Sequence, residues 1–378
     1  MKVAIVHDWL VNFGGAERVV QQFLKIYPQA DIYTLVYDKK KMAKIFPPEK
    51  VHTSFIQKFP MATKIYTKLL SLMPKAFESF DLSSYDLVLC SSSSCAKGVI
   101  THPSVPHVAY VHTPMRYAWD LFFDYKKRSG RVTRFFMDRW MPDIRMWDFI
   151  SAQRIDSVIA NSNYIARRIK KFWGRDAKVI YPPVDTQRLS PNYKESEDFY
   201  VVFSRFVPYK RVDLAISACI RLKRKLVVIG SGSGEKSLKT LANGNSDIIF
   251  TGRISDEEVK NYLQRCKALI FCAEEDFGII PVEAQACGRP VIAYGKGGAL
   301  ETVIDGKTGI FFDRQEEKSL ADAIERFEKL GAFYDQKSVY EHAASFSEER
   351  FRKQMEQTLN EILSEFYPAG ECKNGVFK

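Results

Sequence analysis

The stretch EEDFGIIPVEAQACGRPVIA, residues 274–293, places two acids, Glu275 and Glu283, on either side of the segment DFGIIPV. Acids are usually kept out of apolar runs, because burying a carboxylate without partners is costly. The preceding run ALIFCAEE has the composition of a buried strand, and Pro281 belongs to a residue type favoured in a helix's first turn. We therefore expect a strand that ends near Glu275, a close turn at Gly278 and a helix that begins at about Pro281.

This arrangement suits a ligand that is rich in hydroxyl groups. Each carboxylate can accept paired hydrogen bonds from vicinal hydroxyls. The amides of Gly278, Ile279 and Ile280 are expected to face the ligand, and Glu283 would lie in the first turns of the helix, where the dipole favours an anion. A nucleotide sugar carries two such diols, one on the ribose and one on the sugar.

Short β-branched runs alternate with amphipathic segments along the chain, which is typical of parallel sheets covered by helices on both faces. A helix is expected over 16–27, and strands in the first half within 2–7, 31–36, 86–92, 107–112 and 157–162. A proline-rich segment, 179–198, interrupts the pattern and predicts a linker. Strands in the second half are expected within 199–206, 225–232, 247–254, 268–275 and 290–298.

The alternation predicts two doubly wound α/β domains, residues 1–185 and 186–354. The last helix, roughly 347–366, is expected to have no strand after it and to pack back, so that residues from about 355 to 378 join the first domain. Two such sheets facing each other would bind a ligand between the carboxyl ends of their strands.

Two further loops carry residues suited to a diphosphate. Gly14 and Gly15 precede a helix whose N-terminal amides would point at an anion, although a tight turn explains a glycine pair equally well. Arg205 and Lys210, in SRFVPYKR, follow the first strand of the second domain. A guanidinium and an ammonium there could hold one diphosphate; two solvated surface cations are the alternative.

The formal net charge of +11 is concentrated in the first half of the chain. Residues 1–190 hold 29 Lys and Arg against 16 Asp and Glu, and the remainder holds 27 against 29. In residues 39–50, 55–77 and 125–147 the cations interleave with Phe, Tyr, Trp and Met. This mixture suits an anionic membrane surface, but single-stranded nucleic acid uses the same residue types, and some of these rings will be core residues.

The cysteines and the N-terminus restrict the class of protein. Seven cysteines without C-x-x-C spacing argue against a disulfide framework and a zinc site. The start MKVAIVHDWL predicts a strand rather than a signal peptide, and no apolar run approaches the ~18–20 residues that span a membrane. We expect a cytoplasmic protein with reduced, buried thiols.

The paired glutamates, the SRFVPYK segment and the GGAERV loop resemble the retaining nucleotide-sugar glycosyltransferases of family 4. HTPMRYAWD (112–120), RMWDFISAQRIDSVIANS (145–162), VIYPPVD (179–185) and GKGGALETVIDGKTGIFF (295–312) extend the likeness to bacterial mannosyltransferases of polysaccharide assembly. The resemblance implies the GT-B fold, an α/β class with two facing Rossmann-like doubly wound domains and a C-terminal helix that crosses back to the N-terminal domain.

The resemblance also implies roles for individual residues. Arg205 and Lys210 would hold the donor diphosphate and stabilise its departure, with Gly14 and Gly15 approaching it from the N-terminal domain. Glu283 would bind the ribose, and Glu275 and the amides of residues 278–280 would contact the transferred sugar. His112 would donate or accept a hydrogen bond near the reaction centre. The remaining donor-binding residues would be Arg253 and Ile254, against the base, and Phe277.

The resemblance thus implies retaining transfer of a hexose, with mannose from GDP-mannose as the expected donor, to a lipid-linked or polysaccharide acceptor in cell-surface glycan synthesis. In such a transfer the leaving phosphate can take the proton of the acceptor hydroxyl. Asp8, at the end of the first strand, is expected to organise a loop and not to act as a base. No metal or other cofactor is expected beyond the nucleotide-sugar co-substrate, because the chain lacks D-x-D and its cations can neutralise the diphosphate. We expect peripheral association with the inner face of the membrane and no nucleic acid. The alternatives are a UDP-sugar-dependent transferase of the same fold, a nucleotide-sugar epimerase, and a nucleic-acid-binding protein that would leave the glutamates unexplained.

Overall fold

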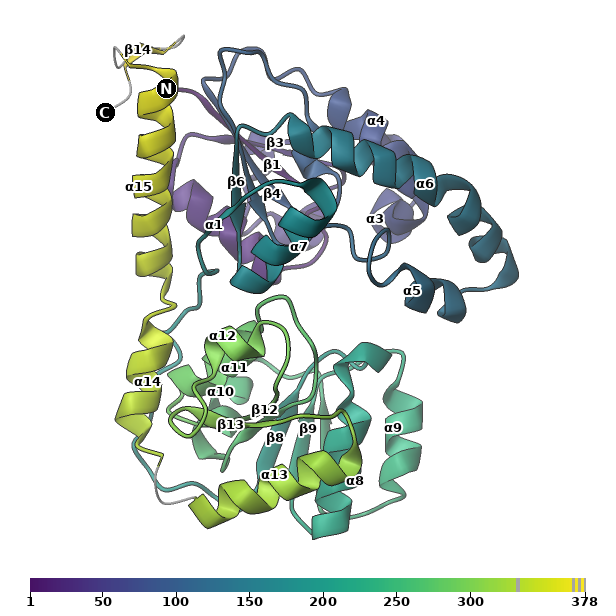
Figure 1. Ribbon diagram of the computed structural model, residues 1–378, viewed down its shortest axis with the longest axis vertical. Helices are drawn as coiled ribbons and strands as arrows, with labels where there is room; N and C mark the ends of the chain where they lie inside the picture. Colours follow the sequence, from purple (N-terminus) through teal and green to yellow (C-terminus); the bar gives the residue numbers. More distant parts are fainter. Residues whose placement is uncertain (331–333, 369–370, 373–374, 377–378) are drawn as a thin grey trace. The chain divides into compact units, whose positions relative to one another are not determined.

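The computed structural model describes residues 1–330, 334–368, 371–372 and 375–376 (Figure 1). The chain forms two compact units, an N-terminal unit of Met1–Pro183 with Phe351–Lys378 and a C-terminal unit of Val184–Arg350. The first boundary lies two residues before the expected one, and the return to the N-terminal unit comes four residues early. The structure thus groups the last helix with the N-terminal unit.

The N-terminal unit contains a seven-stranded parallel sheet in the order β3-β2-β1-β4-β5-β6-β7. Its strands are β1 (Val3–His7), β2 (Asp31–Thr34), β3 (Val51–Thr53), β4 (Leu87–Ser92), β5 (His107–Val111), β6 (Ser157–Ala160) and β7 (Lys178–Val179). Every residue of β1, β4 and β5 is buried, because helices cover both faces.

The helices of the N-terminal unit are α1 (Gly15–Ile26), α2 (Lys39–Met42), α3 (Ala62–Ile65), α4 (Met73–Glu78), α5 (Phe122–Arg128), α6 (Arg131–Gln153), α7 (Asn163–Trp173) and α15 (Glu348–Phe366). Short 3₁₀ helices are η1 (Pro48–Lys50), η2 (Phe55–Lys58), η3 (Tyr66–Leu72) and η4 (Ala96–Gly98). Alternate residues of β1 point to opposite faces. Val3 and Ile5 pack with α1 and α15, and Ala4 and Val6 join the core under α4, α6 and α7.

The C-terminal helix α15 completes one face of the N-terminal sheet (Figure 1). Phe351 stacks on Phe23 of α1, with ring centroids 6.1 Å apart, and Met355 and Leu359 are fully buried in the same core. The prediction of no strand after this helix is wrong. β14 (Glu371–Cys372) and β15 (Gly375–Val376) form a short antiparallel pair, whose two-residue strands are too short to give a sequence pattern.

The C-terminal unit contains a six-stranded parallel sheet in the order β10-β9-β8-β11-β12-β13. Its strands are β8 (Tyr200–Phe203), β9 (Leu226–Ile229), β10 (Ile248–Gly252), β11 (Leu269–Phe271), β12 (Val291–Tyr294) and β13 (Gly309–Phe312). Its helices are η5 (Pro208–Lys210), α8 (Val212–Leu222), α9 (Glu235–Ala242), α10 (Asp256–Arg265), α11 (Ile279–Ala286), α12 (Ala299–Thr302), α13 (Glu317–Leu330) and α14 (Gln336–Ala344). α8 and α13 pack side by side on one face of this sheet.

Local signals explain where several helices begin and end. Ser255 and Glu258 form a reciprocal capping box at the start of α10. Ser162 caps α7, whose C-terminus is closed by Gly174 in the left-handed conformation. Both sheets have the Rossmann strand order, so the winding reverses between β1 and β4 and between β8 and β11. Ligands of such folds bind at the carboxyl ends of these central strands.

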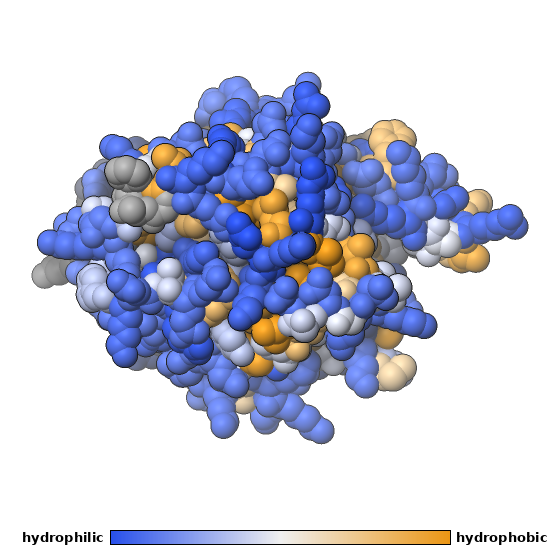
Figure 2. Space-filling view, turned by 90° about the horizontal axis from the view of Figure 1, so that it is seen from below, coloured by the Kyte–Doolittle hydropathy of each residue, from blue (hydrophilic) through white to orange (hydrophobic). Residues whose placement is uncertain are grey.

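The surface and the thiols fit an ordinary globular chain. The face shown in Figure 2 is mainly hydrophilic, with hydrophobic side chains in smaller groups between the charged ones. All seven cysteines are free thiols and six of them are buried, as the sequence predicts. Across the described residues, none of the helices combines the length and the apolar character needed to cross a membrane.

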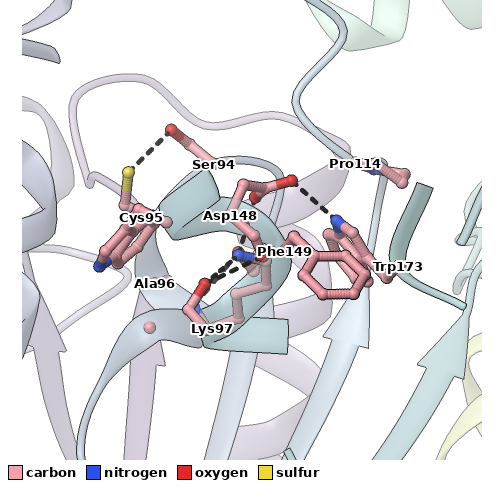
Figure 3. Close-up of polar contacts among 12 residues, drawn as sticks. Ser94, Cys95, Ala96, Lys97, Pro114, Asp148, Phe149 and Trp173 are labelled. Carbon is pink, nitrogen blue, oxygen red and sulfur yellow. Dashed lines mark hydrogen bonds and ion pairs between the residues drawn. The ribbon is translucent and has the colours of Figure 1, made fainter. Parts of the chain in front are cut away.

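A fully buried ion pair joins α6 to the loop after β4 (Figure 3). Lys97 Nζ lies 2.8 Å from Asp148 Oδ1 and donates to Ser151 Oγ at 2.8 Å. The indole N–H groups of Trp119 and Trp173 donate to Asp148 Oδ2 at 2.8 and 2.7 Å. Because both charges are fully desolvated but well partnered, this pair fixes the position of α6 more than it adds to stability.

Lys97→Met should therefore destabilise the N-terminal unit by about 3–5 kcal/mol, because the Asp148 carboxylate would stay buried without its cation. Urea unfolding followed by tryptophan fluorescence would measure the loss, since Trp173 adjoins the pair. Adding Asp148→Asn should recover part of it. Lys170→Met, which breaks the exposed pair with Asp176, is the control and should cost less than about 1 kcal/mol. Equal effects of the two lysine changes would contradict this account.

Candidate functional site

In the C-terminal unit, the loops after β8 and β11 bring a cation and an acid together. Lys210, at the end of η5, forms an ion pair with Glu275, four residues beyond β11. Their side chains are 10% and 22% exposed, so the pair is largely shielded but still reachable. β8 and β11 are neighbours in the sheet, which is why two residues 65 positions apart meet at its carboxyl edge.

The backbone at Glu275 is held by a glycine loop that follows β12. The N–H of Gly298 donates to the Glu275 carbonyl at 2.8 Å. A Cβ at Gly297 would lie 2.5 Å from that carbonyl oxygen, and one at Gly298 would lie 2.3 Å from the backbone of Phe277. Only glycines allow this close approach, which gives a physical reason for the GKGG segment.

Helix α11 begins at Ile279, two residues before the expected start at Pro281. Gly278 adopts φ +85°, a left-handed conformation that L side chains rarely adopt, and this turn directs the chain into the helix. Pro281 falls in the first turn, where its missing N–H needs no partner. Ile279 and Ile280 are the first two helical residues, and Glu283 is partly buried one turn further on.

The other residues predicted for the donor site have different surroundings. Arg205 is exposed and donates to the Tyr209 hydroxyl at 3.1 Å. Arg253, exposed, and Ile254, half-buried, follow the edge strand β10. The Phe277 side chain is buried and packs edge-on against Phe346, with ring centroids 5.6 Å apart. The Phe277 ring therefore belongs to the core, and its backbone is the part that lies beside the site.

In the N-terminal unit, Asp8 organises the loop after β4, as the sequence predicts. Asp8 Oδ2 accepts hydrogen bonds from the N–H groups of Ser93 and Ser94 at 2.6 and 3.0 Å, and from Ser93 Oγ at 3.0 Å. Asp8 Oδ1 accepts from the N–H of Ala96 at 2.8 Å. With its oxygens engaged in this way, Asp8 links the carboxyl ends of β1 and β4.

Gly14 and Gly15 lie at the start of α1. Gly14 is the exposed N-cap residue and is extended, with φ −155°, and Gly15 is the first helical residue. A Cβ at Gly14 would lie 3.2 Å from Glu17 Oε2, so the first turn also carries a carboxylate close to the glycine pair. The amides there are geometrically suited to an anion.

A chain of buried polar contacts leads from Glu17 to His112. His7 Nε2 lies 3.5 Å from Glu17 Oε1, and His7 Nδ1 lies 3.1 Å from both the carbonyl oxygen and the Oγ of Ser91. Ser91 Oγ lies 2.8 Å from Nε2 of His112, which directly follows β5. His7, Glu17 and Ser91 were not predicted as site residues from the sequence, although Glu17 lies in the GGAERV motif and His7 at the end of β1.

The contacts in this chain shift the pKa values of the two histidines in opposite directions. Burial lowers the pKa of His7, but hydrogen bonding and charge attraction from Glu17 outweigh it, so the pKa of His7 is raised. Burial lowers the pKa of His112 to about 3, and the charge of His7 acts in the same direction. The Ser91 carbonyl oxygen can only accept, so His7 Nδ1 donates towards Ser91 and leaves the Ser91 hydroxyl proton for His112 Nε2. His112 is then neutral, with its proton on Nδ1.

A cavity of about 910 Å³ lies at the amino ends of the strands of the C-terminal sheet. Charged residues such as Lys223, Arg224 and Glu328 line it. It is at the opposite end of the strands from Lys210 and Glu275. Within the described ranges, His, Cys, Asp and Glu side chains form no group of three or more that could hold a metal ion.

Two protein-family models match this chain. The model described as "Glycosyltransferase Family 4" matches residues 13–188, and the model described as "Glycosyl transferases group 1" matches residues 184–348. Both models describe glycosyltransferases, and the two parallel sheets with the Rossmann strand order have the architecture of the GT-B fold. The chain belongs to glycosyltransferase family 4, which confirms the resemblance and the fold class predicted from the sequence.

Relatives with curated descriptions include mannosyltransferases. The chain is 26% identical over 371 residues to alpha-1,3/1,6-mannosyltransferase ALG2 of Saccharomyces cerevisiae, a match that covers 80% of this chain and 71% of that protein. It is 32% identical over 200 residues to the GDP-mannose-dependent alpha-(1-6)-phosphatidylinositol monomannoside mannosyltransferase of Mycobacterium tuberculosis, covering 45% and 51%. A 33% identical match to an uncharacterised glycosyltransferase of Methanocaldococcus jannaschii covers 45% and 48%. The chain thus spans about half the length of two of these three relatives.

Solved structures share the fold at low sequence identity. Anabaena HepE in complex with UDP has a TM-score of 0.71 at 20% identity, covering 96% of this chain and 100% of that one. Sucrose-phosphate synthase from Thermosynechococcus elongatus has a TM-score of 0.73 at 17% identity, covering 97% and 100%. These likenesses show the fold alone.

Ser91→Ala should remove the hydroxyl that fixes the His112 tautomer. We expect the wild type to show a neutral His112 protonated at Nδ1 near pH 7, and the variant to show a mixture of tautomers, because Nε2 loses its hydrogen-bond donor. Long-range ¹H–¹⁵N spectra of the imidazole rings would measure this. Ser93→Ala, which affects a hydroxyl bonded to Asp8 instead, is the control. A wild-type His112 protonated at Nε2 would contradict the assignment.

Proposed function

We propose that this glycosyltransferase transfers a hexose with retention, mannose from GDP-mannose, to a lipid-linked or polysaccharide acceptor. The observation that carries the proposal is the contact between Lys210 and Glu275 at the carboxyl edge of the C-terminal sheet. A cation and an acid at this edge, beside the start of α11, match the two chemical parts of a sugar nucleotide, its diphosphate and its hydroxyl groups.

The chemistry follows from where charge develops. As the bond between sugar C1 and the phosphate oxygen breaks, negative charge gathers on the leaving diphosphate. Lys210 and Arg205 stabilise this charge, and the amides of Ile279 and Ile280 add their dipoles. Glu275 accepts hydrogen bonds from the transferred sugar and Glu283 from the ribose, while Arg253 and Ile254 lie against the base. Gly14 and Gly15 approach the diphosphate.

His112 acts as a neutral hydrogen-bond donor to the sugar near the reaction centre. With its pKa lowered to about 3, it does not take the acceptor's proton as a base that titrates near neutrality. The departing phosphate accepts that proton, and the acceptor hydroxyl attacks C1 on the same face. No metal ion takes part in this proposal, because the cations neutralise the diphosphate.

The choice of donor and acceptor is supported by the relatives. Two of those described above are mannosyltransferases, and the name of one includes GDP-mannose and phosphatidylinositol monomannoside. The exposed aromatic and cationic residues of α5 and α6 support an acceptor held at an anionic membrane surface, with the protein peripherally bound. A UDP-sugar is the second candidate donor, because the similar Anabaena HepE structure is a complex with UDP.

Lys210→Ala and Glu275→Ala should each reduce sugar transfer by roughly a hundredfold or more, because each removes a group that stabilises the reacting donor. Transfer of radiolabelled mannose to a membrane lipid extract would measure the rate. Lys318→Ala, on the exposed side of α13, is the matched control and should keep wild-type turnover. Wild-type rates in either site variant would exclude the assignment. Donor consumed equally without acceptor would indicate an epimerase or hydrolase instead.

Sugar nucleotides should stabilise the protein against heat according to their affinity. At a concentration of about 100 times its Kd, a ligand stabilises the folded state by about 2.7 kcal/mol. We expect GDP-mannose to raise the melting temperature, UDP-glucose to have little effect, and Lys210→Ala to abolish the shift. A thermal-shift series over GDP- and UDP-sugars would measure these differences. A larger shift with a UDP-sugar would replace GDP-mannose by the second candidate.

A further inference from the structure

A cavity of about 770 Å³ opens in the N-terminal unit, between η3, α5 and α6. Pockets of roughly 300–1,000 Å³ are typical of small-molecule sites. Its apolar wall is formed by Trp9, Leu70, Met73, Phe136, Met141 and Ile144. The proposed donor residues do not line this cavity, so it is a separate candidate binding site.

Helices α5 and α6, which contribute to the wall of the cavity, expose large apolar side chains. Phe123 and Phe135 are 68% and 67% exposed, and Trp140, which lines the cavity, stacks on Phe136 with ring centroids 4.6 Å apart. Large apolar side chains exposed together on one segment are a feature of interaction sites. Exposed aromatic rings on a helix are suited to the boundary between lipid headgroups and hydrocarbon.

The same segment is strongly cationic. Residues 122–140 hold six Lys and Arg against two Asp, and Lys68 lies in the cavity wall itself. Lys126 pairs with Asp138 and Arg139 pairs with Asp143, and the segment still carries more positive than negative charge. An apolar cavity with a cationic rim complements an amphiphile that has a hydrocarbon chain and an anionic head.

The inner wall of the cavity belongs to the loops at the carboxyl ends of β1 and β4. Trp9 follows β1, and Ser94 follows β4. The N–H of Ser94 donates to Asp8 at 3.0 Å, and its hydroxyl bonds the Tyr117 hydroxyl at 2.7 Å. A chain bound in the cavity is therefore held beside the edge of the sheet where this fold binds substrates.

We propose that this cavity binds the hydrocarbon chain of a lipid-phosphate acceptor, with the phosphate at the cationic rim. The role of this ligand as the acceptor rests on the proposed function, whereas its binding to the cavity does not. A second copy of the chain fits less well, because a symmetric contact would place the cations of one α5–α6 segment against those of the other. An uncharged apolar partner would leave those cations uncompensated.

Binding of farnesyl phosphate by the full chain, measured by isothermal titration calorimetry, tests the proposal. Glycerol phosphate, which has the head but not the chain, should not bind at the same concentration. Thr133→Trp should fill the cavity and weaken binding by about tenfold, the loss expected when about two methylene groups are excluded from an apolar site. Val132→Trp is the matched control and should change nothing. Thr133 lines the cavity and Val132 does not, and both are exposed, so neither change threatens folding.

Farnesyl phosphate that binds Thr133→Trp as well as it binds the wild type would overturn the proposal, as would equal binding of glycerol phosphate. If phosphatidylglycerol vesicles displaced farnesyl phosphate, the cavity would be a site for bulk membrane lipid, and this result would also overturn the proposal. GDP-mannose binding, measured in parallel, separates the two proposals. If the protein binds farnesyl phosphate but not GDP-mannose, the proposed function is excluded and the cavity assignment stands. If it binds GDP-mannose but not farnesyl phosphate, the cavity assignment is excluded and the proposed function stands.

Discussion

The ion pair between Lys210 and Glu275 depends on the strand order of the C-terminal sheet. β8 and β11 are adjacent although more than 60 residues separate them, and the chain leaves their carboxyl ends in different directions. Two loops therefore meet at this edge. The N–H of Gly298 holds the Glu275 backbone through a hydrogen bond, at an approach that only glycines at 297 and 298 allow. The fold thus delivers a preorganised charge pair, which is the condition for electrostatic stabilisation of a leaving group.

In the N-terminal unit, hydrogen bonds and an ion pair between buried polar groups fix the loop that follows β4. Asp8 ties the start of the loop after β4 to β1, and Lys97, three residues beyond Ser94, ties its end to α6 through Asp148. Each buried charge has partners, and such networks specify one arrangement more sharply than apolar packing does. The same loop leads from β4, where Ser91 contacts His112, to the wall of the apolar cavity. A substitution in this loop would therefore affect both the contact of Ser91 with His112 and the wall of the cavity.

The sequence predicted those features that depend on local pattern. Strands such as β1, β4 and β8 are continuous apolar runs, and Lys210 and Glu275 could be placed at strand ends from spacing alone. β3 and β7 were not predicted, because they have only three and two residues and are partly exposed. β13 was also not predicted, although its four residues are mostly buried. The contact of Ser91 with His112 needs the register in which Ser92 lies opposite Val111, and the Lys97–Asp148 pair needs α6 to fold across the sheet. Neither is visible in any local window.

The pairing of Lys210 with Glu275 also has a consequence for selectivity. Before a donor binds, each group neutralises the other in a setting where water reaches only part of them. A diphosphate alone would take Lys210 and leave Glu275 partly desolvated without its cation, which is unfavourable. A sugar nucleotide brings a diphosphate for Lys210 and hydroxyl groups for Glu275 in one molecule, so it compensates both. On the proposed function, the ion pair thus discriminates against the product nucleotide, which has lost the sugar, and favours its release once transfer is complete.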